Sequence, residues 1–180
     1  MTITNETTQI PVRLAFDSFA AGYSRAMAHL DQAATRELDK AEIDPKLREL
    51  IRIRASQLNG CAYCIDMHTK DARAAGETEQ RLYCLDAWRE APFYTDRERA
   101  ALAWTEAITR ISDGHAPDDV FEEVRKHFTD EELSNLTIAI VAINGWNRLA
   151  IGFRAVAGTY QPGKMHAQEK VSSGEACAAP

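Results

Sequence analysis

Several features that mark common protein classes are missing from this 180-residue chain. No apolar run approaches the ~20 residues that span a bilayer, and residues 1–13 lack the basic-then-apolar layout of a secretory signal. No basic cluster offsets the formal net charge of -6, which argues against nucleic acid as the main partner. No segment shows the alternation of apolar and polar residues that is typical of strands. These absences predict an all-α, cytoplasmic protein without a membrane or nucleic-acid partner.

Cysteine is sparse, with four residues in the chain. In the reducing compartment that we expect, four cysteines indicate redox or metal chemistry rather than a fold held together by disulfides. Cys84 lies on an amphipathic stretch and Cys177 in a polar tail, and neither has a reactive neighbour in the sequence. Cys61 and Cys64 form a CxxC motif and are therefore the candidates for chemistry.

Helical periodicity extends over most of the chain. The hydrophobic content of 45% is enough for one domain with its own core. Apolar residues recur at helical spacing over 13–41, as one long helix or two helices broken near Gly22. Capping boxes at 95–98 and 129–132 open further helices, the first of which we expect to end at Asp113-Gly114. The expected organisation is an extended arm, an all-α domain of about six to eight helices and a disordered tail: 1–12, 13–160 and 161–180.

The helix expected from Leu133 to Arg154 has an unusual composition. Its middle, 136–143, is apolar almost all round, as in a buried helix. Together with the long N-terminal helix it offers more apolar surface than one small domain covers, so we expect a homo-oligomer. Asn144, Asn147 and Arg148 follow within the same helix, and we interpret them as an interhelical or subunit-interface network because buried polar groups need partners.

The reactive residues lie at the junction of two predicted helices. One helix opens at Asp44-Pro45 and ends at Asn59-Gly60, and the next starts at the cysteines. At roughly 100° per residue, Cys61, Cys64 and His68 fall within about 60° of one another on an apolar face. Both cysteines lie in the first helical turn, where free N–H groups and the helix dipole favour a thiolate. This is the arrangement of a working dithiol with an imidazole beside it.

The CxxC motif alone is compatible with three interpretations. Thioredoxin-like use expects a βαβ context, which this sequence lacks. A structural zinc site needs four ligands, whereas Cys61, Cys64 and His68 supply three at most. Inert core cysteines are the third interpretation. We favour redox use, because a histidine one turn after Cys64 can serve as a base.

Two charged residues of the preceding helix are ambiguous from periodicity. Glu49 lies about 180° from the stripe that contains Leu47 and Leu58, so a solvated glutamate is the default interpretation. Arg54 lies on the apolar stripe itself, which snorkelling or an ion pair explains without any function.

Taken together, Glu49, Cys61, Cys64 and His68 resemble the alkylhydroperoxidase D-like (AhpD-like) branch of the carboxymuconolactone decarboxylase family. The signature is a glutamate twelve positions before a CxxC motif and a histidine four positions after it. The similar region runs from Asp44 to Gly76, with weaker support through Arg154. The resemblance implies an all-helical subunit that assembles into homotrimers or homohexamers. It also implies antioxidant reduction of organic hydroperoxides without a bound cofactor, with electrons from a lipoyl- or thioredoxin-type protein.

The resemblance further assigns a role to each residue. Cys64 is the peroxidatic thiol, Cys61 is the resolving thiol that forms the redox-active disulfide with it, and His68 and Glu49 form a proton relay. The best-known members carry a second histidine where this chain has Tyr63. The decarboxylase branch generally lacks the dithiol, so we do not expect lactone decarboxylation. The alternatives are a slowly turning-over dithiol oxidoreductase or redox sensor, and a structural protein with a CxxC-linked metal site.

Overall fold

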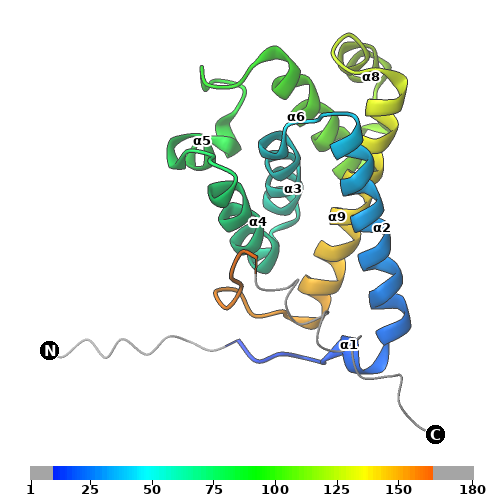
Figure 1. Ribbon diagram of the computed structural model, residues 1–180, viewed down its shortest axis with the longest axis vertical. Helices are drawn as coiled ribbons and strands as arrows, with labels where there is room; N and C mark the ends of the chain where they lie inside the picture. The colour runs from blue at the N-terminus through cyan, green and yellow to red at the C-terminus, as the bar shows by residue number, and fades with distance from the viewer. Residues whose placement is uncertain (1–9, 164–180) are drawn as a thin grey trace, which may run out of the picture.

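The computed structural model describes residues 10–163, and this part of the chain forms a bundle of helices without strands (Figure 1). The all-α prediction is confirmed. Nine α-helices and one 3-10 turn are present in these residues, more than the six to eight expected, because α1 and α7 are separate four-residue segments. The elements are α1 (Phe16–Phe19), α2 (Ala21–Lys40), α3 (Pro45–Asn59), α4 (Ala62–Ala74), α5 (Glu79–Tyr83), η1 (Leu85–Ala87), α6 (Asp96–Thr109), α7 (Ile111–Gly114), α8 (Asp118–Arg125) and α9 (Asp130–Phe153).

Helix α3 lies at the centre of the bundle. It contacts α4, α6 and α9, while α9 contacts α2 as well (Figure 1). Because neighbours enclose α3 on several sides, its residues from Glu49 to Ser56 are all buried, including the polar ones. Any charged side chain on this helix must therefore find its partners inside the protein.

The predicted helix boundaries around the reactive residues are confirmed. The Asp44 side chain accepts a hydrogen bond from the backbone N–H of Lys46 at 2.8 Å, and Pro45 occupies the first helical position. Gly60 ends α3 in the left-handed conformation with φ 72°, which a residue with a side chain adopts at a cost. The capping boxes that begin with Thr95 and Thr129 are both formed.

One of two further predicted boundaries needs correction. The break expected near Gly22 is confirmed and lies at Ala20, whose backbone N–H donates to the carbonyl of Phe16 and closes α1 as a single turn. Helix α6 ends at Thr109 rather than at Asp113-Gly114, because Arg110 leaves the helical conformation with ψ 42°. Of the predicted arm, residues 10–12 are not helical. Residues 1–9 and 164–180, which include Cys177, lie outside the described residues.

Helix α9 corrects one expectation and leaves another standing. By length and average composition it could cross a membrane, a test that the core helix of a bundle also passes, but it contains no uninterrupted apolar run of ~20 residues. Its contacts with α2, α3 and α6 are those of the core helix of a bundle. It is not buried all round, since Ile138 and Val141 are 41% and 53% exposed. One face of α9 therefore remains uncovered by the other described residues.

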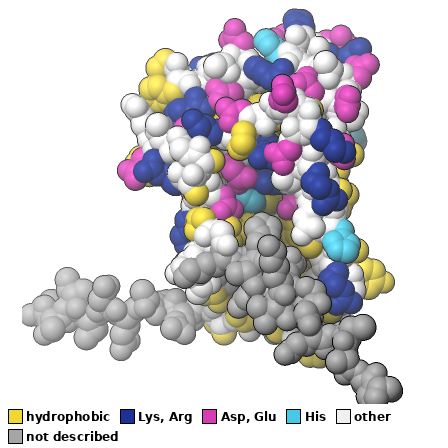
Figure 2. All heavy atoms as spheres, in the orientation of Figure 1, with side chains coloured by type: hydrophobic (Ala, Val, Ile, Leu, Met, Phe, Trp, Pro, Cys, Tyr) yellow, Lys and Arg dark blue, Asp and Glu magenta, His cyan; other side chains and the backbone are white. Residues whose placement is uncertain are grey.

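The surface shows two kinds of composition. On the face seen in Figure 2, basic and acidic side chains are interspersed over the upper part, and hydrophobic side chains are more frequent toward the lower end. The lower end of this view contains α1 and the C-terminal end of α9 (Figure 1). Charge is thus not separated into a one-sign patch on this face.

Candidate active site

The two cysteines begin helix α4. Cys61 is its N-cap residue, and Cys64 lies in the first turn. Both are free thiols and only 1% exposed. They belong to a core cluster with Ala55 of α3 and with Ile143 and Ala150 of α9. The structure therefore places the dithiol where the sequence predicted, at a helix N-terminus on an inward face.

The surroundings of the dithiol favour loss of one proton. A hydrogen bond from the Cys64 thiol lowers the pKa of Cys61 to about 7, against the effect of burial, and the backbone N–H groups of Cys64 and Tyr63 contribute. These N–H groups belong to the second and third helical positions, which an N-cap side chain normally satisfies. The same interaction raises the pKa of Cys64, which holds its proton next to the Cys61 sulfur. The directions of these two pKa changes favour a thiolate on Cys61 over one on Cys64.

Glu49 and His68 form a buried pair between α3 and α4. The His68 Nδ1 and Glu49 Oε2 atoms are 2.8 Å apart, and the Arg52 guanidinium donates to Glu49 Oε1 at 2.8 Å. Glu49 is 9% exposed, so the interpretation of a solvated glutamate is wrong. Its position opposite the apolar stripe faces α4 rather than water. The structure thus joins two residues that lie 19 positions apart in the sequence.

The protonation states of this pair follow from its partners. Burial alone would raise the pKa of Glu49, but the hydrogen bonds and charges of His68 and Arg52 outweigh it and lower the pKa below its usual 4.5. An ionised carboxylate only accepts hydrogen bonds, so Nδ1 of His68 carries the proton that is donated to Glu49. In the neutral ring, Nε2 is then the acceptor. No hydrogen bond joins His68 to either thiol among the described side chains, which leaves Nε2 available to a substrate or a water molecule.

Arg52 connects this pair to a third helix. Its second terminal nitrogen donates to Thr35 Oγ1 at 2.8 Å and to Asp31 Oδ1 at 3.2 Å, both on α2. A buried guanidinium with three oxygen partners is satisfied in its charge and its hydrogen bonds. The network therefore fixes the orientation of Glu49, and through Glu49 that of the His68 ring.

Asn147 of α9 contacts the dithiol as well. Its side-chain amide lies close enough to the two sulfur atoms to favour their ionised forms and to lower the pKa of each. It also donates to Ser56 Oγ at 3.0 Å and accepts from Asn59 at 2.9 Å. The predicted interhelical network is confirmed, with Asn144 donating to Thr109 at 3.0 Å. The contact of Asn147 with the thiols was missed, although its spacing from Ile143 and Ala150 places it on the face of α9 that meets the cysteines.

A second carboxylate lies near the Glu49–His68 pair. One polar atom from each of Glu49, His68 and Asp71 lies within 4.8 Å of the other two. Two carboxylates and an imidazole are donors that metals accept. Here the Arg52 guanidinium and the His68 ring already neutralise Glu49, so we do not assign the three residues as metal ligands. The sequence analysis did not select Asp71, although it lies three residues after His68 on the same helix.

Other candidate residues lie away from this site. Arg54 forms ion pairs with Asp86 and with Glu106, the latter at 2.8 Å, which confirms the ion-pair interpretation of this charged residue. Cys84 is half-buried and packs against a different core cluster from the one that holds Cys61 and Cys64. Neither residue takes part in the dithiol site.

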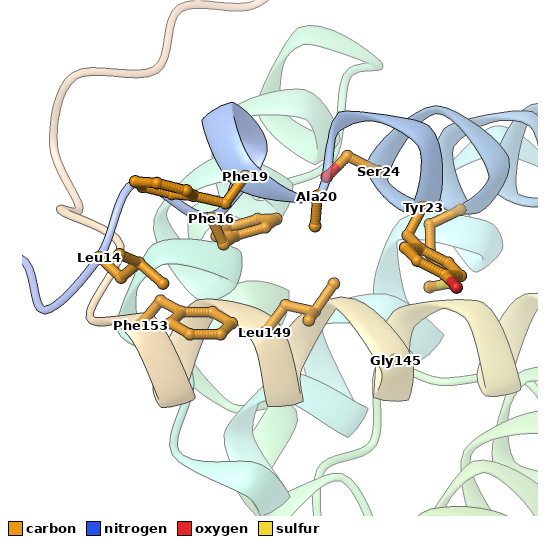
Figure 3. Close-up of a pocket in the computed structure, with 10 residues that line it drawn as sticks. Leu14, Phe16, Phe19, Ala20, Tyr23, Ser24, Gly145, Leu149 and Phe153 are labelled. Carbon is orange, nitrogen blue, oxygen red and sulfur yellow. The ribbon is translucent and has the colours of Figure 1, made fainter.

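An apolar cavity lies on the opposite side of α9. It has a volume of about 470 Å³ and is lined by side chains of α1, α2 and α9 (Figure 3). Phe16 of α1 stacks on Phe153 of α9 with ring centroids 5.3 Å apart. Phe19 and Tyr23 border the cavity and are 77% and 81% exposed. We call this cavity the α1–α9 groove.

The fold and the site define a class, namely an all-helical protein with a dithiol at a helix N-terminus and a carboxylate–histidine pair beside it. The sequence model of the Carboxymuconolactone decarboxylase family matches residues 21–107. Uncharacterized protein YdfG of Bacillus subtilis (strain 168) is 52% identical over 112 residues, which are 62% of this chain and 76% of that protein. The chain therefore belongs to the carboxymuconolactone decarboxylase family.

Solved structures identify the branch of this family. ATU0492 of Agrobacterium tumefaciens, a protein of unknown function whose name provisionally assigns it to AhpD-type antioxidant defence, is 40% identical, with a TM-score of 0.77. The match covers 83% of this chain and all of that one. An AhpD-core peroxidase-related protein of Ralstonia eutropha JMP134 shares the fold, at 21% identity and a TM-score of 0.69, over 80% of this chain and 75% of that one. The AhpD-like branch is thus the one to which the chain belongs.

Proposed function

We propose that this protein is a thiol peroxidase that reduces organic hydroperoxides to alcohols, with Cys61 and Cys64 as the electron donors. The observation that carries the proposal is the dithiol at the N-terminus of α4, with a lowered pKa at Cys61 and a Glu49–His68 pair on the same helix junction. The AhpD-type name of the Agrobacterium relative supports the same reaction class.

The first step oxidises Cys64. Its sulfur attacks the O–O bond of the hydroperoxide, and its proton, held firmly beside the Cys61 thiolate, passes to a base. We assign that base to Nε2 of His68, one turn further along α4, because Glu49 holds the Nδ1 proton. The proton then goes to the departing alkoxide. The products are an alcohol and a sulfenic acid on Cys64.

The second step forms the disulfide. The Cys61 thiolate attacks the Cys64 sulfur, the S–S bond forms, and the hydroxyl group takes up a proton and leaves as water. A thiol whose pKa lies near the working pH is both an effective attacking group and a good leaving group. The pKa of about 7 therefore suits Cys61 for resolving the sulfenic acid, and for leaving again when an external dithiol attacks Cys64. We propose a lipoyl- or thioredoxin-type protein as that dithiol.

The burial of both thiols favours a second candidate function. At 1% exposure each, the two sulfur atoms are difficult for a large reductant to reach. A redox sensor needs only one oxidation event and tolerates slow re-reduction. The two functions differ in turnover: a peroxidase consumes many equivalents of hydroperoxide when a dithiol is supplied, whereas a sensor consumes one.

Single-cysteine variants test the proposed roles. In Cys61→Ser, one equivalent of cumene hydroperoxide should leave a sulfenic acid on Cys64, which a dimedone-type reagent traps for peptide mass spectrometry. In Cys64→Ser, hydroperoxide consumption should fall to the background rate. Sulfenic acid on Cys61 in the Cys64→Ser variant would show instead that Cys61 is the peroxidatic thiol and Cys64 the resolving thiol. An unchanged consumption rate in Cys64→Ser would overturn the proposal. Cys84→Ser is the matched control and should behave like the wild type.

A further inference from the structure

The segment that follows α9 lies across helix α4. This strap, residues 155–160, is visible beside the lower end of α4 in Figure 1. The backbone N–H of Gly158 donates to Asp66 Oδ2 at 2.9 Å, and Lys70 Nζ donates to the carbonyl of Tyr160 at 3.1 Å. The Tyr160 phenol donates to Asp71 Oδ1 at 2.7 Å. The strap therefore contacts α4 at Asp66, Lys70 and Asp71, and the last of these lies within 4.8 Å of the Glu49–His68 pair.

Asp71 lies between the strap and the reactive centre. Glu49 and Arg52 of α3, His68 of its own helix and Tyr160 of the strap are the titratable or charged groups that face it. Burial raises the pKa of Asp71 above its usual 3.8, and the Glu49 carboxylate adds to this, while the hydrogen bond from Tyr160 opposes it. Asp71 is thus the acid of this cluster that gains a proton more readily than an ordinary aspartate, whereas the pKa of Glu49 is lowered.

The proposed reaction needs one proton that the dithiol does not hold. Disulfide formation with release of an alcohol and water consumes two protons in total. With Cys61 as a thiolate, the pair brings only the proton of Cys64, and the first step transfers this proton to the alkoxide. The hydroxyl group that leaves in the second step must therefore receive its proton from another group.

We propose that Asp71, positioned by Tyr160 of the strap, supplies this second proton through His68: Asp71 protonates Nε2, while Glu49 keeps the Nδ1 proton, and the resulting imidazolium gives the Nε2 proton to the leaving hydroxyl group. The geometry supports the assignment, because Asp71 lies within 4.8 Å of His68 and Glu49, and both oxygens of Glu49 already have partners. The half-buried position of Asp71 at the strap allows it to regain a proton from solvent. Asp71 and Tyr160 are positioning residues that act through His68. The inference rests on the proposed peroxidase function.

The two residues make opposite predictions for the pH profile. A donor must be protonated, so the rate of the second step falls as pH rises through the pKa of Asp71. The Tyr160 hydrogen bond stabilises the carboxylate, so Tyr160→Phe raises the pKa of Asp71 and moves this fall to higher pH. Asp71→Asn abolishes the decrease in the rate of the second step with rising pH. It also slows this step about tenfold, which is less than the loss of a general acid can cost, because water partly replaces the donor.

Rapid-mixing experiments separate the two chemical steps. Purified protein is mixed with one equivalent of cumene hydroperoxide over a range of pH, and sulfenic acid and disulfide are quantified by quenching and mass spectrometry. We expect Asp71→Asn to accumulate sulfenic acid on Cys64 while its first step stays at the wild-type rate. Asp66→Ala, which removes another strap contact, is the control and should keep the wild-type pH profile. Equal slowing of both steps at every pH in Asp71→Asn would overturn the proposal. A pH profile of Asp66→Ala that matches the profile of Asp71→Asn would overturn it as well.

A second measurement is independent of peroxide chemistry. In the NMR titration of the His68 ring, the wild type should show an extra step from Asp71, which Tyr160→Phe shifts to higher pH and Asp71→Asn removes. Absence of that step in the wild type would refute the coupling. If hydroperoxide does not oxidise the wild type at all, the proposed function fails, and the titration still decides whether Asp71 exchanges charge with the pair.

Discussion

The polar centre and the apolar face of this molecule differ in whether their side chains find partners within one chain. In the polar centre, formed by Glu49, Arg52, His68, Cys61 and Cys64, each charged group has a partner on a neighbouring helix. On the apolar face, formed by α1, α2 and α9, the side chains of Phe19, Tyr23, Ile138 and Val141 are exposed by 41% to 81%. The described residues thus supply partners for the charged groups of the polar centre but leave a hydrophobic surface uncovered.

The difference indicates a separate role for each region. Buried charges are retained only with partners, because an unpaired one costs several kcal/mol. Exposed apolar side chains that cluster on adjacent helices instead mark an interaction surface. The α1–α9 groove, beside the projecting Phe19 and Tyr23, belongs to this surface (Figure 3). We propose that a second copy of the chain covers it, in the homotrimer or homohexamer expected from the sequence.

The largest expected effect comes from breaking the polar centre at Glu49. Glu49→Gln leaves Arg52 with one fewer charged partner and leaves a single accepting oxygen for Arg52 and His68, so we expect a loss of about 3 kcal/mol in unfolding free energy and about a hundredfold in peroxide reduction. The pKa of Glu49 is lowered in the fold, so its stabilisation is complete above its usual 4.5 and is lost as pH falls through the folded value. The stability difference between wild type and variant should therefore shrink below about pH 4.

Glu106→Gln is the matched control for this prediction. Glu106 also accepts from an α3 arginine, Arg54, at 2.8 Å, and its pKa is lowered too, but it does not contact the dithiol site. Chemical denaturation at several pH values should show a stability loss in both variants, and only Glu49→Gln should lose activity. Equal losses of activity in both would contradict the assigned role of Glu49.

A smaller effect should come from the apolar face. Tyr23→Ser is expected to weaken assembly without changing the fold, because the phenyl ring is 81% exposed in the single chain and borders the groove. Tyr83→Ser on α5 is its control, since that ring is 77% exposed but lies outside the apolar face. Light scattering should give a multiple of 20.1 kDa for the wild type and for Tyr83→Ser, and a lower mass for Tyr23→Ser. A monomeric wild type would contradict the proposed assembly.

The smallest expected effect is a change in the pKa of Cys61. The hydrogen bond from Cys64 is the main cause of the lowered pKa of Cys61, so Cys64→Ala should raise that pKa from about 7 toward the usual 9.0. Ultraviolet absorbance of the thiolate during a pH titration measures it directly. A pKa that stays near 7 in the variant would show that the N-terminal N–H groups of α4 stabilise the thiolate without Cys64.

The structural features that the sequence predicts correctly are those that depend on residues close together in the chain. Asp44, Thr95 and Thr129 cap their helices as expected, and Gly60 ends α3 so that the cysteines open α4. The burial of Glu49 was not predictable from its periodicity, because α3 is enclosed on the side where a surface helix would face water.

The missed residues depend on contacts between distant segments. Tyr160 and Asp71 meet across 89 positions, and Asn147 reaches Ser56 across 91. Only the course of the chain after α9 and the packing of α9 on α3 bring them to the site. The roles of Cys61, Cys64, His68 and Glu49 stay predictions, although the structure places all four at one helix junction.

The central claim is that Cys61 and Cys64 act as a peroxide-reactive dithiol. Free thiols should be counted before and after one equivalent of cumene hydroperoxide, and peptide mass spectrometry should locate any new disulfide. We expect rapid loss of two thiols, mapped to a Cys61–Cys64 disulfide that an external dithiol reverses. Both thiols remaining titratable after the same treatment would contradict it.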